Sequence, residues 1–130
     1  MRPKRHPPSS RSEIRDQVEA RSKIWCERGG ELVLSEWRLD LLAAVGETGS
    51  LSRAAERLDV PYRTAWHKLK AVEEQLGVRL LDTQSGGAGG GGSFLTPEAQ
   101  ELIRRFRRVR QGVSELVTRR FESEFADWLG

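Results

Sequence analysis

The chain has 130 residues, a length that favours one small domain with one modest hydrophobic core. Its 22 basic and 19 acidic residues leave a net charge of +3, so the arrangement of charge says more about partners than the total does. A single cysteine excludes an intramolecular disulfide, and no apolar run reaches the roughly 18 residues of a membrane helix. We therefore expect a cytoplasmic protein without a membrane partner.

Residues 1–22 form a basic N-terminal segment that we expect to be largely disordered, because its first part is rich in Pro, Arg and Ser. The arm either touches DNA or has no specific role. A short helix over residues 12–20 is also possible, with a thin apolar edge at Ile14 and Val18.

Two short apolar runs, 23–27 and 31–34, predict a β-hairpin that turns at Arg28-Gly29-Gly30, since adjacent glycines supply the positive φ of tight turns. A lone hairpin is marginally stable, so it must pack on the helical body or on another chain. Trp25 is the expected anchor, in the core or at a dimer contact, and Cys26 is expected to be a small core residue.

A helix is predicted after Ser35, which is a good N-cap, with Glu36 in its first turn and Gly46 or Gly49 near its end. Its buried face is expected to consist of four apolar residues, which are Trp37, Leu41, Leu42 and Val45.

The stretch from Gly49 to Leu81 predicts two helices separated by a break at Asp59-Val60-Pro61, since proline cannot occupy a helix interior. Ser50 is the expected cap of the first helix. The apolar positions recur at helical spacing, and they are Leu51, Ala54, Ala55 and Leu58 in the first helix and Ala65, Leu69, Val72 and Leu76 in the second.

The second helix, about 62–76, leaves a polar face opposite its apolar face, as in a helix-turn-helix whose second helix enters the major groove. Arg63 could read guanine or clamp a phosphate, Thr64 could bond a phosphate or touch a thymine methyl, and His67 could contact a base. For each, the alternative is an ordinary surface side chain. The whole expected DNA-binding set on the two helices is Ser50, Ser52, Tyr62, Arg63, Thr64, His67, Lys68 and Lys70. For Trp66, packing beneath the wing is preferred to DNA contact.

Runs 78–83 and 93–95 predict the strands of a hairpin, or wing, over about 79–96, with the glycine run Gly86–Gly92 at its tip. The alternative is a flexible linker. Glycine amides can approach a phosphate backbone closely, so Gly87, Gly89, Gly90 and Gly91 are expected DNA contacts.

Thr96 and Pro97 predict the start of a last helix, about 50 Å long if it is unbroken to residue 129. A small domain cannot cover such an apolar stripe, so we expect a twofold homodimer. The expected dimer contacts are Leu102, Phe106, Val109, Val113, Leu116 and Val117. Gly112 is a candidate bend, and the alternative is that the second half folds back on its own hairpin.

The segments ETGSLSRAAERL and LKAVEEQLGVRLL resemble the winged helix-turn-helix of LysR-type regulators. Tyr62-Arg63-Thr64-Ala65-Trp66 and the GGAGGGG wing followed by FLTPEAQELI are similar to the DNA-binding domain of the molybdate-dependent regulator family ModE and its short relatives. The resemblance covers about Lys23 to Val109. It implies a dimeric winged-helix regulator of transcription that binds DNA through Tyr62, Arg63, Thr64, His67 and the wing. Because the chain ends at Gly130, without room for an oxyanion-binding domain, direct molybdate binding is not expected.

The predicted fold is mainly α with small β elements: residues 1–22 form the arm, 23–96 the winged helix-turn-helix with its N-terminal hairpin, and 97–130 the dimerisation helix. The predicted function is a sequence-specific transcriptional regulator that binds a near-palindromic site in double-stranded DNA. The alternative is a protein-interaction adaptor, which could dock through the C-terminal acidic and aromatic residues Phe121, Glu122, Glu124, Phe125, Asp127 and Trp128. No catalytic triad, paired apolar-site carboxylates or metal-ligand spacing is present in the sequence, so we expect neither an enzyme nor a cofactor or metal.

Overall fold

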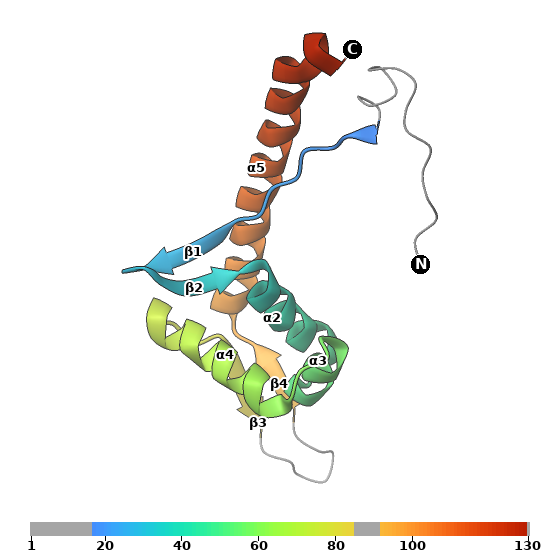
Figure 1. Cartoon of the computed structure of the whole chain (residues 1–130). Helices are drawn as coiled ribbons and strands as arrows, with labels where there is room; N and C mark the ends of the chain where they lie inside the picture. The colour runs from blue at the N-terminus through green and yellow to red at the C-terminus, as the bar shows by residue number, and fades with distance from the viewer. Residues whose placement is uncertain (1–16, 85–91, 130) are drawn as a thin grey trace. The chain divides into compact units, whose positions relative to one another are not determined.

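The computed structural model describes residues 17–84 and 92–129 (Figure 1). Contacts divide the chain into two units. The main unit is Lys23–Arg108, and the C-terminal unit combines residues from 109 onward with the described residues up to Ser22.

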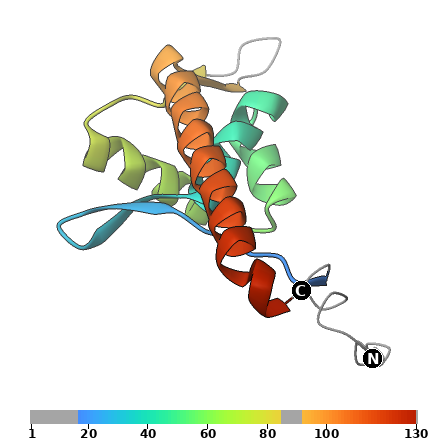
Figure 2. The same ribbon diagram turned by 90° about the horizontal axis from the view of Figure 1, so that it is seen from above.

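The main unit begins with the predicted hairpin and continues with three helices, a second hairpin and the start of a long helix (Figure 1). The elements are β1 (Trp25–Arg28), β2 (Glu31–Ser35), α2 (Glu36–Thr48), α3 (Leu51–Arg57), α4 (Tyr62–Leu76), β3 (Leu81–Gln84), β4 (Gly92–Leu95) and α5 (Pro97–Leu129). This is the predicted winged helix-turn-helix, mainly α with two small antiparallel hairpins. In the view of Figure 2 the start of α5 projects between α4 and the α2–α3 pair.

The helix ends follow the predicted local chemistry. The hydroxyl oxygens of Ser35 and Ser50 accept hydrogen bonds from the amides of Arg38 and Arg53, at 3.2 and 3.1 Å. Gly49 ends α2 in the left-handed conformation, with φ of 69°. Thr96 caps α5 by accepting from the Ala99 amide at 3.1 Å. Ser35, Ser50 and Thr96 each satisfy an amide that a helix start leaves without a partner, so these three predicted N-caps are confirmed, as is the predicted end of α2 at Gly49.

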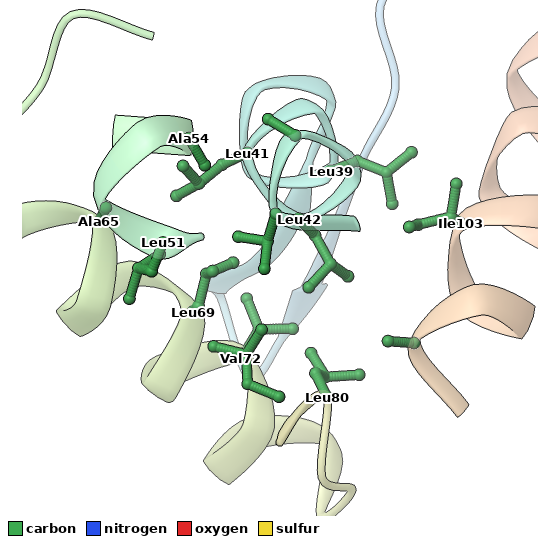
Figure 3. Packing of buried hydrophobic residues seen from close by; sticks show 14 of the residues in the cluster. Leu39, Leu41, Leu42, Leu51, Ala54, Ala65, Leu69, Val72, Leu80 and Ile103 are labelled. Atoms are coloured by element: carbon green, nitrogen blue, oxygen red, sulfur yellow. The ribbon is translucent and has the colours of Figure 1, made fainter. Parts of the chain in front are cut away.

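The core forms where α2 meets α3, α4 and the start of α5. Figure 3 shows Leu42 of α2 near Leu69 and Val72 of α4, Leu41 beside Ala54 of α3, and Leu39 opposite Ile103 of α5. Burying each leucine of this size contributes about 1.5–3 kcal/mol to folding. Ala54 and Ala65 are fully buried, so α3 and α4 approach closely at the turn between them.

Two expectations for the first hairpin change: Cys26 is not a core residue, and of the two places expected for Trp25, the core is excluded. Trp25 is 58% exposed and Cys26 is exposed, because the whole of β1 lies outside β2. The two buried residues of the hairpin strands are Val33 and Leu34 of β2, whereas Arg28 of β1 donates a hydrogen bond to the Gln75 carbonyl of α4 at 2.9 Å.

The buried arc of α2 also differs from the predicted one. Trp37 lies at its exposed edge, and Leu39 and Arg38 are buried in its place. The arc is wide because α2 contacts β2, α3, α4 and β4. Burial lowers the pKa of the Arg38 guanidinium, and its Nη1 donates to the carbonyls of Leu32 and Val33 at 3.3 and 2.9 Å. The buried charge is tolerated because these two carbonyls accept its hydrogen bonds, and the bonds tie the hairpin to α2.

The second hairpin pairs Leu81 with Leu95 and Gln84 with Gly92. This antiparallel pairing confirms the wing over the flexible-linker alternative. The first strand begins at Leu81, later than the predicted start at residue 78. Val78 and Arg79 are exposed and belong to the loop between α4 and β3. The glycine run at residues 86–91 lies outside the described part of the chain.

Helix α5 is unbroken over 33 residues and continues through Gly112. Ala99, Ile103 and Phe106 are buried in the core of the main unit, which therefore extends to Arg108 and not only to residue 96. The expectation that Phe106 is a dimer contact is wrong for the same reason, since its side chain is already covered within the main unit. Leu102 is partly buried against the same core.

In the C-terminal unit, Gln17 is helical and residues 18–22 are not, so the possible helix over residues 12–20 does not extend beyond Gln17, and residues 12–16 lie outside the described range. A groove of about 710 Å³ separates this segment from α5, with Phe121, Phe125 and Leu129 among its lining. The rings of Phe121 and Phe125 stack with centroids 4.8 Å apart.

Candidate nucleic-acid interface

The turn between α3 and α4 sets where α4 begins. Asp59 adopts the left-handed conformation with φ of 56°, and the amides of Asp59 and Val60 donate to Glu56 and Ala55 at 3.0 Å. Pro61 then precedes the first turn, and its carbonyl accepts from the Ala65 amide at 3.1 Å. Because proline cannot occupy a helix interior and disfavours the helical conformation in the residue before it, α3 and α4 cannot run on as one helix.

The polar face of α4 lies at the surface of the main unit, as predicted. Arg63, His67 and Lys68 are exposed, and Thr64 is half-buried. The opposite face, Ala65, Leu69 and Val72, is almost completely buried. The predicted division of α4 into a core face and a solvent face is therefore confirmed for these residues, whereas Leu76, the fourth residue of the predicted apolar face, is 41% exposed at the end of the helix.

Two aromatic side chains flank this polar face. Tyr62 and Trp66 line a shallow concavity of about 510 Å³ together with Arg63 and His67. Trp66 is 39% exposed, its ring meets the His67 ring edge-on at 5.2 Å, and Lys70 Nζ lies 5.8 Å from its centroid. Trp66 therefore belongs to the exposed surface of α4, whereas the preferred prediction is that it packs beneath the wing.

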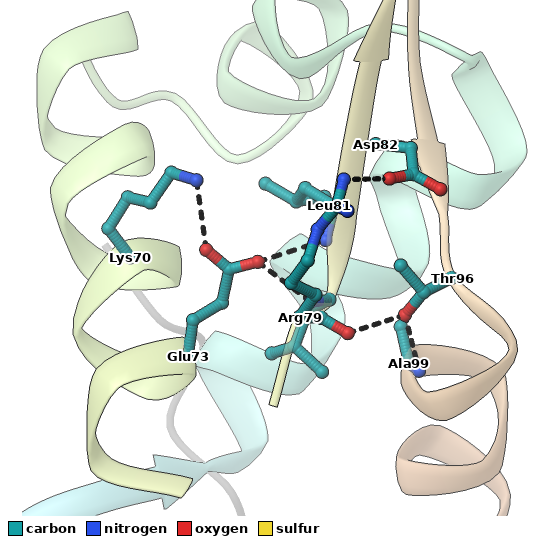
Figure 4. Close-up of polar contacts among 8 residues, drawn as sticks. Lys70, Glu73, Arg79, Leu81, Asp82, Thr96 and Ala99 are labelled. Carbon is teal, nitrogen blue, oxygen red and sulfur yellow. Dashed lines mark hydrogen bonds and ion pairs between the residues drawn. The ribbon is translucent and has the colours of Figure 1, made fainter. Parts of the chain in front are cut away.

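Lys70 is engaged within the protein. Its ammonium lies 2.9 Å from Glu73 Oε1, and the side chain of Glu73 is only 11% exposed (Figure 4). Oε2 of the same carboxylate accepts from the amides of Leu80 and Leu81 at 2.7 and 3.1 Å. Burial raises the pKa of the Glu73 carboxyl, but the two amides and Lys70 outweigh it, so that its pKa lies below the ordinary value of 4.5.

The wing is fixed at its base by backbone bonds to the rest of the main unit. The Thr96 hydroxyl donates to the Arg79 carbonyl at 2.6 Å (Figure 4), and the Thr96 amide donates to the Leu80 carbonyl at 3.0 Å. On the other strand, the Ser93 amide donates to the Gly49 carbonyl at 3.0 Å. A Cβ at Gly92 would meet that same carbonyl oxygen at 3.0 Å, so glycine permits the close approach.

The remaining predicted site residues differ in their placement. Ser52 is exposed at the start of α3, whereas Ser50 is half-buried and its side chain serves as the cap. Gly87, Gly89, Gly90 and Gly91 lie outside the described residues. Sequence reasoning missed Glu73, although its spacing of three from Lys70 on one helix is a signal for an ion pair.

Within the described ranges, no cluster of three or more His, Cys, Asp or Glu side chains is arranged to hold a metal ion. A search of the same ranges finds no helix with the length and apolar character needed to cross a bilayer.

The family model described as bacterial regulatory helix-turn-helix protein, lysR family, matches residues 37–100, from the first turn of α2 to the first turn of α5. The chain carries a LysR-type winged helix-turn-helix domain. The matched span contains the polar face of α4 and both described strands of the wing.

Curated relatives extend the likeness of the LysR-type domain to proteins of molybdenum metabolism. The chain is 37% identical over 92 residues to the molybdenum-pterin-binding protein MopB of Rhodobacter capsulatus, a match that covers 71% of the chain and 34% of the relative. It is 38% identical over 79 residues to the molybdenum transport protein ModE of Herbaspirillum seropedicae, covering 61% of the chain and 29% of the relative. The chain thus spans about a third of the length of these relatives.

Solved structures with the same fold include two of a regulator bound to DNA. The DNA-binding domain of CbnR in complex with DNA has a TM-score of 0.52 and 26% identity, covering 68% of this chain and 95% of that one. Full-length CbnR in complex with its target DNA has a TM-score of 0.52 and 27% identity, covering 66% of this chain and 28% of that one.

Proposed function

We propose that the LysR-type domain binds double-stranded DNA sequence-specifically and that the protein regulates transcription as a dimer. The observation that carries this proposal is α4, which has one face sealed in the core and the other, with Arg63, His67 and Lys68, exposed beside the wing. A helix held in this way can enter the major groove without uncovering the core. The similar CbnR structures, which are complexes with DNA, support the same function.

The side chains at the start of α4 divide by chemistry. Arg63 can donate two hydrogen bonds to guanine O6 and N7, and His67, one turn further along, can contact a neighbouring base. Thr64 and Lys68 flank these two and suit phosphate oxygens. Tyr62 lies at the exposed start of the helix, where its hydroxyl can reach a phosphate of the DNA backbone.

The dimer would form along α5. Val109 and Leu116 are 58% and 46% exposed, and Val113 and Val117, between and beside them, are half-buried. Apolar residues at steps of three and four on a helix of 33 residues make a stripe that a second copy can cover. A twofold dimer presents two copies of α4, and its binding site is then near-palindromic.

The test is fluorescence anisotropy with a duplex selected by the protein from a random pool and with an unselected duplex. Arg63→Ala together with His67→Ala should weaken binding to the selected duplex by a few kcal/mol, roughly 1–3 for each base contact, and change binding to the unselected duplex little. Arg119→Ala on α5 is the control, an exposed arginine outside the main unit. Equal losses on both duplexes would contradict base reading by α4.

A protein-docking function is the second candidate, because one observation favours it. Trp128 is 63% exposed next to Phe125, whose ring it meets edge-on at 6.0 Å, and Glu124 and Asp127 are exposed beside them. Failure of the protein to retain any duplex in the anisotropy experiment would favour this adaptor function over DNA binding.

A further inference from the structure

Glu73 organises the connection between α4 and the wing through both its backbone and its side chain. Its main-chain carbonyl accepts from the amides of Gly77 and Val78, at 2.8 and 3.2 Å. Its carboxylate accepts from the amides of Leu80 and Leu81. One residue of α4 therefore binds four of the amides that lead from the end of the helix into strand β3.

We propose that Glu73 is a positioning residue that sets strand β3 of the wing against α4, and that it retains Lys70 as its counter-ion so that Lys70 makes no phosphate contact on DNA. This proposal rests on the proposed function, and it revises one predicted DNA contact. It concerns the described base of the wing and not its tip.

Lys70 lies on the face of α4 that carries Arg63. Seven residues advance about 700° around a helix, only 20° short of two full turns, so the two side chains leave the helix in nearly the same direction. Position alone thus predicts a phosphate contact, but the Lys70 ammonium is held by the Glu73 carboxylate and lies above the Trp66 ring. Its charge is already compensated before DNA arrives.

Burial explains why this pair should persist in the complex. The Glu73 side chain is nearly covered, and a covered carboxylate needs compensating partners. Releasing Lys70 to a phosphate would leave Glu73 with two amide donors and no positive charge. Lys68 lies two residues earlier on α4 and is exposed, so a phosphate contact by Lys68 would not uncover a buried carboxylate. Lys68 is therefore the matched control.

The experiment measures the dissociation constant of the selected duplex as a function of salt concentration for the wild type, Lys68→Gln, Lys70→Gln, Glu73→Gln and the double variant of 70 and 73. Log affinity falls as log salt rises, and the slope is the steepness of this fall. It decreases by about one for each phosphate contact removed. We expect Lys68→Gln to lower the slope by about one and Lys70→Gln to leave it unchanged. Glu73→Gln should raise the slope by about one, because the freed Lys70 then reaches a phosphate, and the double variant should return to the wild-type value.

If Glu73 had a purely structural role, Glu73→Gln would change affinity and stability but would not raise the salt slope. The double variant would then have no increase in slope to reverse. A slope lowered by about one in Lys70→Gln would overturn the proposal, as would an unchanged slope in Glu73→Gln. If Glu73→Gln does not fold, the comparison of Lys70→Gln with Lys68→Gln still decides.

Amide hydrogen exchange of the protein without DNA separates this proposal from the proposed function. Glu73→Met should speed exchange at Leu80 and Leu81 by about tenfold or more, while Glu74→Met, a change at the exposed neighbouring carboxylate, should not. Unchanged exchange at both amides in Glu73→Met would reject the positioning role whether or not DNA is bound. Faster exchange in a protein that binds no duplex would retain the positioning role and reject the proposed function.

Discussion

Single residues in the main unit show how a polar group is tolerated in a small core. Arg38 and Glu73 are both largely covered, and each is paired with backbone groups of a neighbouring hairpin. Arg38 donates to two carbonyls of β2, whereas Glu73 accepts from two amides at the wing. Pairing offsets the cost of removing each charge from water, so both residues can join neighbouring elements by hydrogen bonds.

The lowered pKa of Glu73 predicts a pH dependence of stability. A carboxylate with a lower pKa in the folded protein than in the unfolded chain stabilises the fold above the unfolded value, near 4.5, and this stabilisation is lost as the pH falls through the folded value. The free energy of unfolding of wild type should therefore exceed that of Glu73→Gln at pH 7. This difference should shrink as the pH is lowered below 4.5, as measured by urea denaturation. Glu74→Gln is the control, and a difference that stays constant with pH would contradict the role of the Glu73 charge.

At the scale of elements, the helices begin and end where side chains or glycines satisfy their last backbone groups. Gly49 ends α2 with a positive φ and also presents its carbonyl to the wing. Gly112 lies within α5, where a Cβ would meet nothing within 4 Å. Glycine is therefore required at position 49 by the backbone conformation, whereas at position 112 it is not required and lowers the helix propensity.

Gly112→Ala should raise the free energy of unfolding by about 0.5–1 kcal/mol, because alanine favours the helical state and no neighbour is displaced. Gly49→Ala should lower it, because a side chain is strained at a φ of 69°. Thermal unfolding followed by circular dichroism measures both. A loss of stability in Gly112→Ala would show that α5 is bent or closely covered at this position.

At the scale of the whole molecule, the exposed apolar residues of α5 predict self-association. Val109 and Leu116 are seven residues apart and lie on the same side of the helix. Replacing both with Asp should convert a dimer to a monomer in sedimentation experiments, because charge on the covered stripe opposes burial. Binding to a duplex with two half-sites should weaken in parallel, as the two copies of α4 are no longer joined.

Gln111→Asp is the matched control for this pair, since residue 111 lies about 200° around the helix from Val109. The control should sediment like the wild type. A double variant that also sediments like the wild type would place the dimer contact elsewhere, with the exposed Trp25 of β1 as the next surface to change.

The sequence by itself determined the helix caps, the break at Pro61, the two faces of α4 and the pairing of the wing strands. These features depend on residues within about one helical turn or one hairpin of each other, so their chemistry is legible along the chain. Tertiary structure alone decided which strand of the first hairpin is covered, that Phe106 belongs to the core, and that Glu73 accepts hydrogen bonds from the amides of Leu80 and Leu81. Those outcomes depend on residues brought together from distant segments, such as Val33 with α2 and Glu73 with Leu80, and no local pattern specifies them.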